Sequence, residues 1–292
     1  MTKIYYELDD ETGELSPVKE RLIAIKDGDR IYHKENIEYA KIQYAAKNDN
    51  GNFIWFLFKY GEELFPNLSA ANLTRLIYAA TFCNKDGFIM SKRELKDRMK
   101  LNRARWSDFW NEVTQNNILY EKNNDVYVNQ NMFCNGRITT TSNYTRLFCE
   151  YIQQLYEQCN SADAHKQLSY LFKIIPFVNR RTNIVCFNPT EQNEENIQFM
   201  RLGDFCEALG YERKNAKRLA RDLLKIRINN ELAIGFFVTD ISEDKWIMVI
   251  NPKLYFGGKY DTIFQKYRNL FTREAKEYQA LLTQQNDLKE NK

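Results

Sequence analysis

The sequence predicts an α+β protein that is predominantly helical, with two tandem modules joined by a helical linker and a small mixed α/β segment at the N-terminus. Three observations predict this fold. The order of helices and strands expected over residues 66–138 recurs over residues 164–260. When these stretches are superposed 110 residues apart, the apolar positions of their third helices coincide and Arg103 falls on Arg213. A motif shared at a distance of 122 residues closes both stretches. We therefore expect an internal duplication.

Residues 1–65 are expected to form the N-terminal segment, in which no chemical motif is recognisable. Strands are predicted at 3–8, 21–25 and 53–59, because these runs are rich in β-branched and aromatic residues. A polar stretch at 36–47 is expected to be helical.

The first module, residues 66–138, begins with a helix that Ser69 can cap. Ser91 and Glu94 form a capping-box pair that starts a second short helix. The expected elements are a helix over 69–80, a strand over 88–90, helices over 91–99 and 103–116, and two strands over 118–121 and 126–129 joined by a polar hairpin tip. Helix, strand, helix, turn, helix and two-stranded wing is the order of a winged helix-turn-helix domain.

Residues 139–163 are expected to form a linker and a connecting helix, because apolar residues recur at helical spacing over 144–159. The second module, residues 164–260, repeats the order of the first. Its expected elements are a helix over 164–178, a strand over 183–187, helices over 202–209 and 213–227, and two strands over 231–238 and 246–250. Residues 261–292 are expected to form a further helix, over 262–282, and a polar tail.

The stretch from Arg213 to Arg227 stands out by its charge. It holds seven basic residues and one acid, in a chain whose formal net charge is only +3. Its apolar residues have the spacing of one buried helix face, so that its cations gather on the opposite face. A solvated basic helix and a surface for a polyanion are both consistent with this pattern.

Within a helix-turn-helix, the second helix of the motif enters the major groove of DNA, and residues near its start reach the base edges. The residues in those positions of the second module are Lys214, Asn215, Lys217, Arg218 and Arg221, with Arg213 just before them. Their equivalents in the first module are less basic: Ala104, Arg105, Ser107, Asp108 and Asn111, with Arg103 before them. We therefore expect weaker DNA binding by the first module. Lys122 and Lys245 are candidate contacts from the two wings.

Known enzyme and metal motifs are missing from the sequence. It has no GxxxxGK[ST] phosphate loop, no GxSxG and no HExxH. Six cysteines without a CxxC pair and only two histidines do not form a recognisable zinc site. We expect no cofactor, no metal and no enzymatic activity. The sequence lacks an apolar run of the ~20 residues that a membrane span needs, and a cytoplasmic location is expected.

The motif that closes each module carries a resemblance to a known family. Residues 128–137 read VNQNMFCNGR and residues 250–259 read INPKLYFGGK. The second of these, after a basic recognition helix, resembles the ending of RepL-type plasmid and phage replication proteins, and the tandem arrangement is similar to that of two-winged-helix plasmid initiators. The resemblance implies DNA binding by the recognition helix, at Lys214, Asn215, Lys217, Arg218 and Arg221, and a structural role for Asn251 and Gly258. Gln130 stands in the first module where the second has Pro252.

The leading hypothesis from the sequence is a sequence-specific double-stranded-DNA-binding protein that initiates plasmid or phage replication by assembling on origin repeats. Host helicase, primase or polymerase would then be its protein partners. A winged-helix transcriptional regulator is the nearest alternative, since a fold does not determine the outcome of binding. A protein-interaction module that uses aromatic surfaces around Trp106, Trp110 and Tyr151, without binding DNA, is an alternative of a different class. A homodimer is left open.

Overall fold

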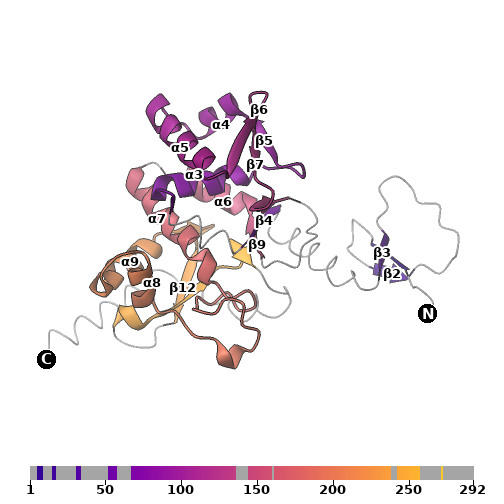
Figure 1. Ribbon diagram of the computed structural model, residues 1–292. Coiled ribbons are helices and arrows are strands. Elements are labelled where there is room, and N and C mark those ends of the chain that lie inside the picture. The colour runs from indigo at the N-terminus through magenta and orange to yellow at the C-terminus, as the bar shows by residue number, and fades with distance from the viewer. Residues whose placement is uncertain are drawn as a thin grey trace. The chain divides into compact units, whose positions relative to one another are not determined.

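The computed structural model describes the chain in several stretches (Figure 1). These are residues 5–8, 15–17, 31–33, 52–57, 67–135, 144–159, 161–237, 242–256 and 271. The elements expected at 21–25, 36–47 and 262–282 lie outside these stretches, apart from Phe271. The chain divides into two compact units, Met1–Gly51 and Asn52–Lys292. The described residues form an α+β structure with seven α-helices and small antiparallel sheets.

The first unit contains a three-stranded antiparallel sheet. Its strands are β1 (Tyr5–Leu8), β2 (Leu15–Pro17) and β3 (Ile31–His33), in the order β2-β1-β3. Strand β1 lies within the strand predicted at 3–8.

The first module follows the predicted order of elements. It contains α3 (Ala70–Ala80), β5 (Phe88–Ser91), α4 (Lys92–Arg98), α5 (Arg103–Gln115), β6 (Leu119–Lys122), β7 (Asp125–Val128) and β8 (Phe133–Cys134). Ser69 and Ser91 cap α3 and α4, as predicted, and each side chain accepts a hydrogen bond from the backbone three residues on. Strands β5, β7 and β6 form one antiparallel sheet. Asn123 and Asn124 both have positive φ, which makes the two-residue turn that matches the twist of a β-hairpin.

The second module is longer and less regular. Its helices are α7 (Ala162–Lys173), α8 (Leu202–Ala208) and α9 (Ala216–Leu223), with short 3-10 helices at η3 (Ile175–Phe177), η4 (Glu194–Asn196), η5 (Arg213–Asn215) and η6 (Glu243–Lys245). Its strands are β10 (Arg227–Ile228), β11 (Glu231–Leu232), β12 (Ile234–Phe237), β13 (Ile247–Ile250) and β14 (Tyr255–Phe256). The strand expected over 183–187 is present only as isolated bridges, among them Ile184 to Val249.

The helix predicted over 144–159 is wrong in its first five residues. Tyr144–Phe148 form strand β9, and the helix α6 runs only from Cys149 to Glu157. Strand β9 pairs along its whole length with β4 (Phe53–Leu57) and also with β14. These partners are remote in sequence, so a spacing typical of a helix could not reveal them.

Strands from both modules share a four-stranded antiparallel sheet, in the order β14-β9-β4-β8. The edge strands β8 and β14 occupy the same place in the repeated motif, with Phe133 and Tyr255 122 residues apart. Strand β4, expected to belong to the N-terminal segment, lies in the second compact unit and pairs with β8 and β9. The sheet thereby joins the stretch before the first module to the ends of both modules.

The repeated motif has the same local geometry in both modules. The Asn129 side chain accepts a hydrogen bond from the Asn131 amide at 3.0 Å, and the Asn251 side chain accepts one from the Lys253 amide at 3.0 Å. Each asparagine also donates from Nδ2 to a backbone carbonyl of its own module. The structural role expected of Asn251 is therefore seen in its contacts, while Gly258 lies outside the described residues.

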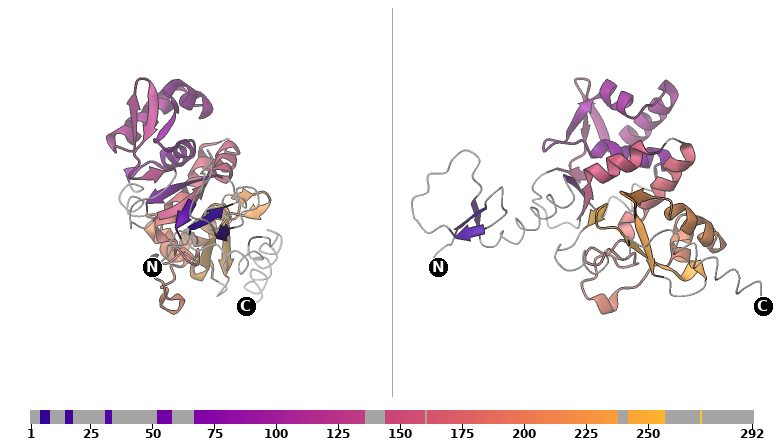
Figure 2. Two further views of the ribbon diagram at one scale, coloured as in Figure 1. Left: turned by 90° about the vertical axis from the view of Figure 1, so that its right-hand side faces the viewer. Right: turned by 180° about the vertical axis from the view of Figure 1, so that it is seen from behind.

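Helices α3 and α7 pack against each other and bring the modules into one hydrophobic core. The Thr74 hydroxyl of α3 donates to the carbonyl of His165 in α7 at 3.0 Å. Tyr78 stacks on Tyr156 of α6, with 3.9 Å between ring centroids. Helix α5 contacts α3, and α9 contacts α7. The α3 and α7 pair lies between α5 and α9 (Figures 1 and 2).

Candidate nucleic-acid interface

Helix α9 buries the apolar face that the sequence predicted. Ala216, Leu219, Ala220 and Leu223 are all at most 4% exposed. The helix is shorter than predicted, because it begins after a 3-10 turn and ends at Leu223. The last residue of the predicted helix, Arg227, belongs instead to β10. The shorter helix still contains Lys217, Arg218 and Arg221, whereas Lys214 and Asn215 lie in the turn before it.

The opposite face of α9 is solvent-exposed and cationic. Arg218 and Arg221 are exposed and form no ion pair with any described residue. Lys217 pairs with Glu243 at 3.7 Å, and Lys214 pairs with Glu212 at 2.6 Å. The Lys217 side chain is 45% exposed and the Lys214 side chain is 75% exposed. The Lys214–Glu212 pair is exposed at both partners and contributes about 0–1 kcal/mol, so Lys214 could exchange its carboxylate for another anion. Glu243, the partner of Lys217, is only 11% exposed.

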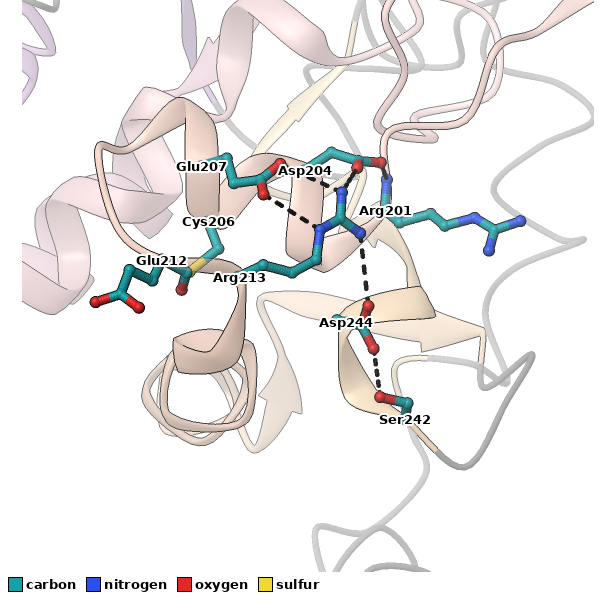
Figure 3. A network of polar contacts seen from close by, with 8 residues as sticks. All are labelled: Arg201, Asp204, Cys206, Glu207, Glu212, Arg213, Ser242 and Asp244. Carbon is teal, nitrogen blue, oxygen red and sulfur yellow. Dashed lines mark hydrogen bonds and ion pairs between the residues drawn. The ribbon is translucent and has the colours of Figure 1, made fainter.

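Arg213 is not available in the same way, because its guanidinium contacts three carboxylates (Figure 3). It pairs with Asp204, with Glu207 at 3.3 Å and with Asp244 at 3.5 Å. Hydrogen bonds to Glu207 and Asp204 raise the pKa of Arg213 above its ordinary value. The pKa of Asp244 is lowered by a hydrogen bond from Ser242 and by the nearby Arg213 guanidinium. Arg213 therefore holds together α8, the turn before α9, and η6.

The space around Arg213 requires a glycine in α8. A Cβ atom at Gly203 would lie 2.8 Å from Nη1 of Arg213 and 2.9 Å from the backbone carbonyl oxygen of Asp244. Such separations are shorter than van der Waals contact. Gly203 thus lets α8 approach both Arg213 and the segment before β13, and this approach positions the start of α9.

Helix α5 presents the corresponding face of the first module. All six residues predicted to face DNA on this helix or just before those positions are exposed: Arg103, Ala104, Arg105, Ser107, Asp108 and Asn111. Phe109 and Val113 are fully buried, like their equivalents on α9. The two predicted wing contacts differ from each other. Lys122 is exposed at the end of β6, whereas Lys245 is half-buried in η6 and has polar partners.

Two surface hollows lie beside these helices, at equivalent places in the two modules. The first hollow, of about 490 Å³, is lined by Ser69, Asn72, Arg75, Arg105, Asp108, Asn111, Glu112 and Gln115. The second hollow, of about 600 Å³, is lined by Asp163, Lys166, Gln167, Tyr170, Cys206, Tyr211, Asn215, Arg218, Leu219, Arg221, Asp222 and Lys225. Each of the five α5 residues in the first hollow has its partner, 110 residues later, in the second.

In each hollow, one acid of the third helix accepts hydrogen bonds from the first helix of its module or from the residue that caps it. Glu112 accepts hydrogen bonds from the Ser69 amide and from Asn72 Nδ2. Its equivalent, Asp222, accepts one from Gln167 Nε2 at 3.1 Å and one from Lys225 Nζ at 3.1 Å. The same link between first and third helix is thus made with different side chains.

The two hollows differ in charge. The second hollow has four cationic and two acidic side chains, whereas the first has two of each. Lys166, Tyr170 and Tyr211 were not predicted as site residues. The packing of α7 against α9 brings Lys166 and Tyr170 to the recognition helix, whereas Tyr211 lies in the turn just before it. The signals in the sequence were the basic character of Lys166 and the place of Tyr211 two residues before Arg213.

Within the described stretches, no group of three or more histidine, cysteine or acidic side chains could hold a metal ion. The six cysteines are free thiols, and burial raises the pKa of Cys83 and Cys149 to about 12. These two thiols are therefore protonated at neutral pH. Among the same residues, no helix combines the length and the apolar character needed to cross a bilayer.

Comparison of the chain with protein-family models, curated proteins and solved structures finds no match. The candidate site therefore has to be interpreted from its own geometry and charge.

Proposed function

We propose that this chain is a sequence-specific double-stranded-DNA-binding protein built from two tandem winged helix-turn-helix modules. The observation that carries the proposal is the exposed cationic face of α9, opposite a fully buried apolar face. A rigid helix with this division can lie in a major groove about 12 Å wide while its cations meet phosphates and base edges.

The order of elements supports the tandem interpretation. In each module a first helix packs on the third, and the third helix is followed by an antiparallel hairpin. The second module would provide the stronger contact, because Arg218 and Arg221 replace Asp108 and Asn111.

The proposed contacts come from both modules. Lys214, Asn215, Lys217, Arg218 and Arg221 form the main set, and Arg103, Arg105 and Lys122 add weaker contacts from the first module. We assign Arg213 and Lys245 to the support of α9 and η6, because their polar groups already have partners within the protein.

We propose that this binding serves initiation of plasmid or phage replication in the bacterial cytoplasm, with host helicase, primase or polymerase recruited to the bound origin. The support for this role is the resemblance of residues 250–259 to RepL-type proteins. A transcriptional regulator would use the same surface. Mapping the bound sequence to an origin or to a promoter distinguishes these two roles.

Fluorescence anisotropy with labelled duplexes across a salt series tests DNA binding. We expect the combined change Lys217→Ala, Arg218→Ala and Arg221→Ala to abolish most of the affinity, because each lost phosphate contact lowers the log–log salt slope by about 0.9. The change Arg103→Ala with Arg105→Ala should cost much less. Negligible affinity of the unaltered protein for all duplexes at low salt, including fragments of its own replicon, would refute the proposal. Equal losses of DNA affinity in the two variants would show that α9 does not make the main contact with DNA.

A further inference from the structure

The second hollow lies directly beside the proposed recognition helix. Arg218 and Arg221 are exposed on α9 and also line the hollow, whose opposite wall comes from α7. A phosphodiester backbone that borders the groove occupied by α9 would therefore pass over this hollow. The inference that follows rests on the proposed function.

Two further donors line the hollow, one from α7 and one from the turn after α8. Lys166 of α7 is exposed, and its ammonium lies 5.8 Å from the ring centroid of Tyr211. The hydroxyl of Tyr211 lies 3.2 Å from that of Tyr170, which is 8% exposed. The hydrogen bond with Tyr170, and then the positive charge of Lys166, lower the pKa of Tyr211 below its ordinary value. A hydroxyl with a lowered pKa is a stronger hydrogen-bond donor to an anion.

The acidic side chains of the hollow leave these cations unneutralised. Asp222 is engaged by Gln167 and Lys225. Asp163 lies in the first turn of α7, where the helix dipole favours a carboxylate. Among the described residues, Lys166, Arg218 and Arg221 have no carboxylate within ion-pair distance. The hollow is therefore a concave surface with three uncommitted cations and a phenol.

The first hollow provides an internal comparison. Asp108 stands at the position of Arg218, and Asn111 at that of Arg221. An acid at this position would repel a phosphate. The equivalent concavity in the first module thus lacks the charge that the second one has.

We propose that the second hollow binds one backbone phosphate of the DNA, with Lys166, Arg218 and the Tyr211 hydroxyl as donors. This contact fixes how deeply α9 enters the groove and in which register it lies. It carries no sequence information itself, because every nucleotide presents the same phosphate.

The test uses the full-length protein and a fluorescein-labelled duplex of mixed sequence, roughly 21 base pairs or two helical turns long. Affinity is measured by anisotropy over a series of KCl concentrations. For Lys166→Gln we expect the slope of log affinity against log salt to be shallower by about 0.9. The loss of affinity relative to the unaltered protein is then about eightfold larger at ~0.1 M salt than at ~1 M. Lys166→Arg keeps the charge and should retain the slope.

Tyr211→Phe separates the neutral donor from the charged ones. We expect a several-fold loss of affinity with an unchanged slope, because a phenol displaces no counterion from DNA. Lys85→Gln is the matched control, since Lys85 is exposed but lies in neither hollow nor on α5 or α9. Urea unfolding of each variant verifies that the fold is intact.

The outcomes separate this inference from the proposed function. If the unaltered protein binds the duplex but Lys166→Gln has the same slope and affinity as Lys85→Gln, the phosphate site is refuted and DNA binding stands. If the unaltered protein does not bind at all, the proposed function itself fails, and this site fails with it.

Discussion

Arg213 shows how one residue can belong to the most basic stretch of a chain and still serve the fold. Its contacts with Asp204, Glu207 and Asp244 join α8, the turn before α9, and η6. The sequence predicted a DNA contact for this cation, five residues before Arg218. Ion pairs between residues 31 positions apart, such as Arg213 with Asp244, depend on the tertiary fold and could not be predicted from local spacing.

Gly203→Ala tests this arrangement at the residue scale. We expect the free energy of unfolding to fall by about 1–3 kcal/mol, the usual cost of overpacking. The added Cβ would meet the Asp244 carbonyl at 2.9 Å, and a backbone oxygen cannot rotate away as a side chain can. The helix propensity of alanine opposes this loss by about 1 kcal/mol. Urea denaturation measures the difference.

Glu207→Ala is the control for Gly203→Ala. It removes one exposed carboxylate from Arg213 and should change the free energy of unfolding by no more than about 1 kcal/mol. If Gly203→Ala is as stable as the unaltered protein, the close approach of α8 to η6 does not exist in solution.

At the scale of elements, α5 and α9 share a buried face and differ in their exposed one. Helical spacing predicted both buried faces, because the period of the helix is a local property of the chain. It also predicted which residues are exposed on α5 and α9. It did not predict β9, where pairing with β4 and β14 outweighs a helical pattern. The hollows beside α5 and α9 likewise depend on which helix packs against them.

Asp108→Arg tests whether the charge of the third helix determines the strength of binding. This change places in α5 the residue that stands at the equivalent position of α9, Arg218. We expect tighter duplex binding and a salt slope steeper by about 0.9, as one phosphate contact is gained. Anisotropy over a KCl series measures both quantities.

Asp86→Arg is the control for Asp108→Arg, because it changes the net charge equally at an exposed turn away from α5. If the two variants bind DNA with the same affinity and slope, then only overall charge matters. The first module would in that case make no specific contact through α5.

At the scale of the whole molecule, the two modules belong to one compact unit, Asn52–Lys292, and share a hydrophobic core. Its four-stranded sheet takes β8 from the first module, β14 from the second, β9 from the segment between them and β4 from the stretch before them, and one hydrophobic core runs through both modules. The packing of α3 against α7 also connects the two modules. We therefore expect the two modules to unfold together.

The four tryptophans allow this to be measured, because Trp246 lies in the second module and Trp55, Trp106 and Trp110 lie before it. One variant keeps only Trp246, with phenylalanine at the other three positions, and a second variant carries only Trp246→Phe. In each variant, tryptophan fluorescence reports on one part of the tandem and circular dichroism reports on the whole chain. We expect the two urea transitions of each variant to have the same midpoint. Two separate midpoints within one variant would show that the modules are independent domains.

The sequence by itself determined the locations of most helices, their buried faces and the cationic surface of α9, because helical periodicity and charge are local properties of the chain. It also determined the internal match between the modules, which is a comparison of one stretch with another. Only the tertiary structure decided that Tyr144–Phe148 form a strand, that Arg213 is held by three carboxylates, and that Lys166 and Tyr211 stand beside the recognition helix. Strand β9, the Arg213–Asp244 pair and the place of Lys166 depend on contacts between residues distant in sequence, which leave no periodic trace in the chain.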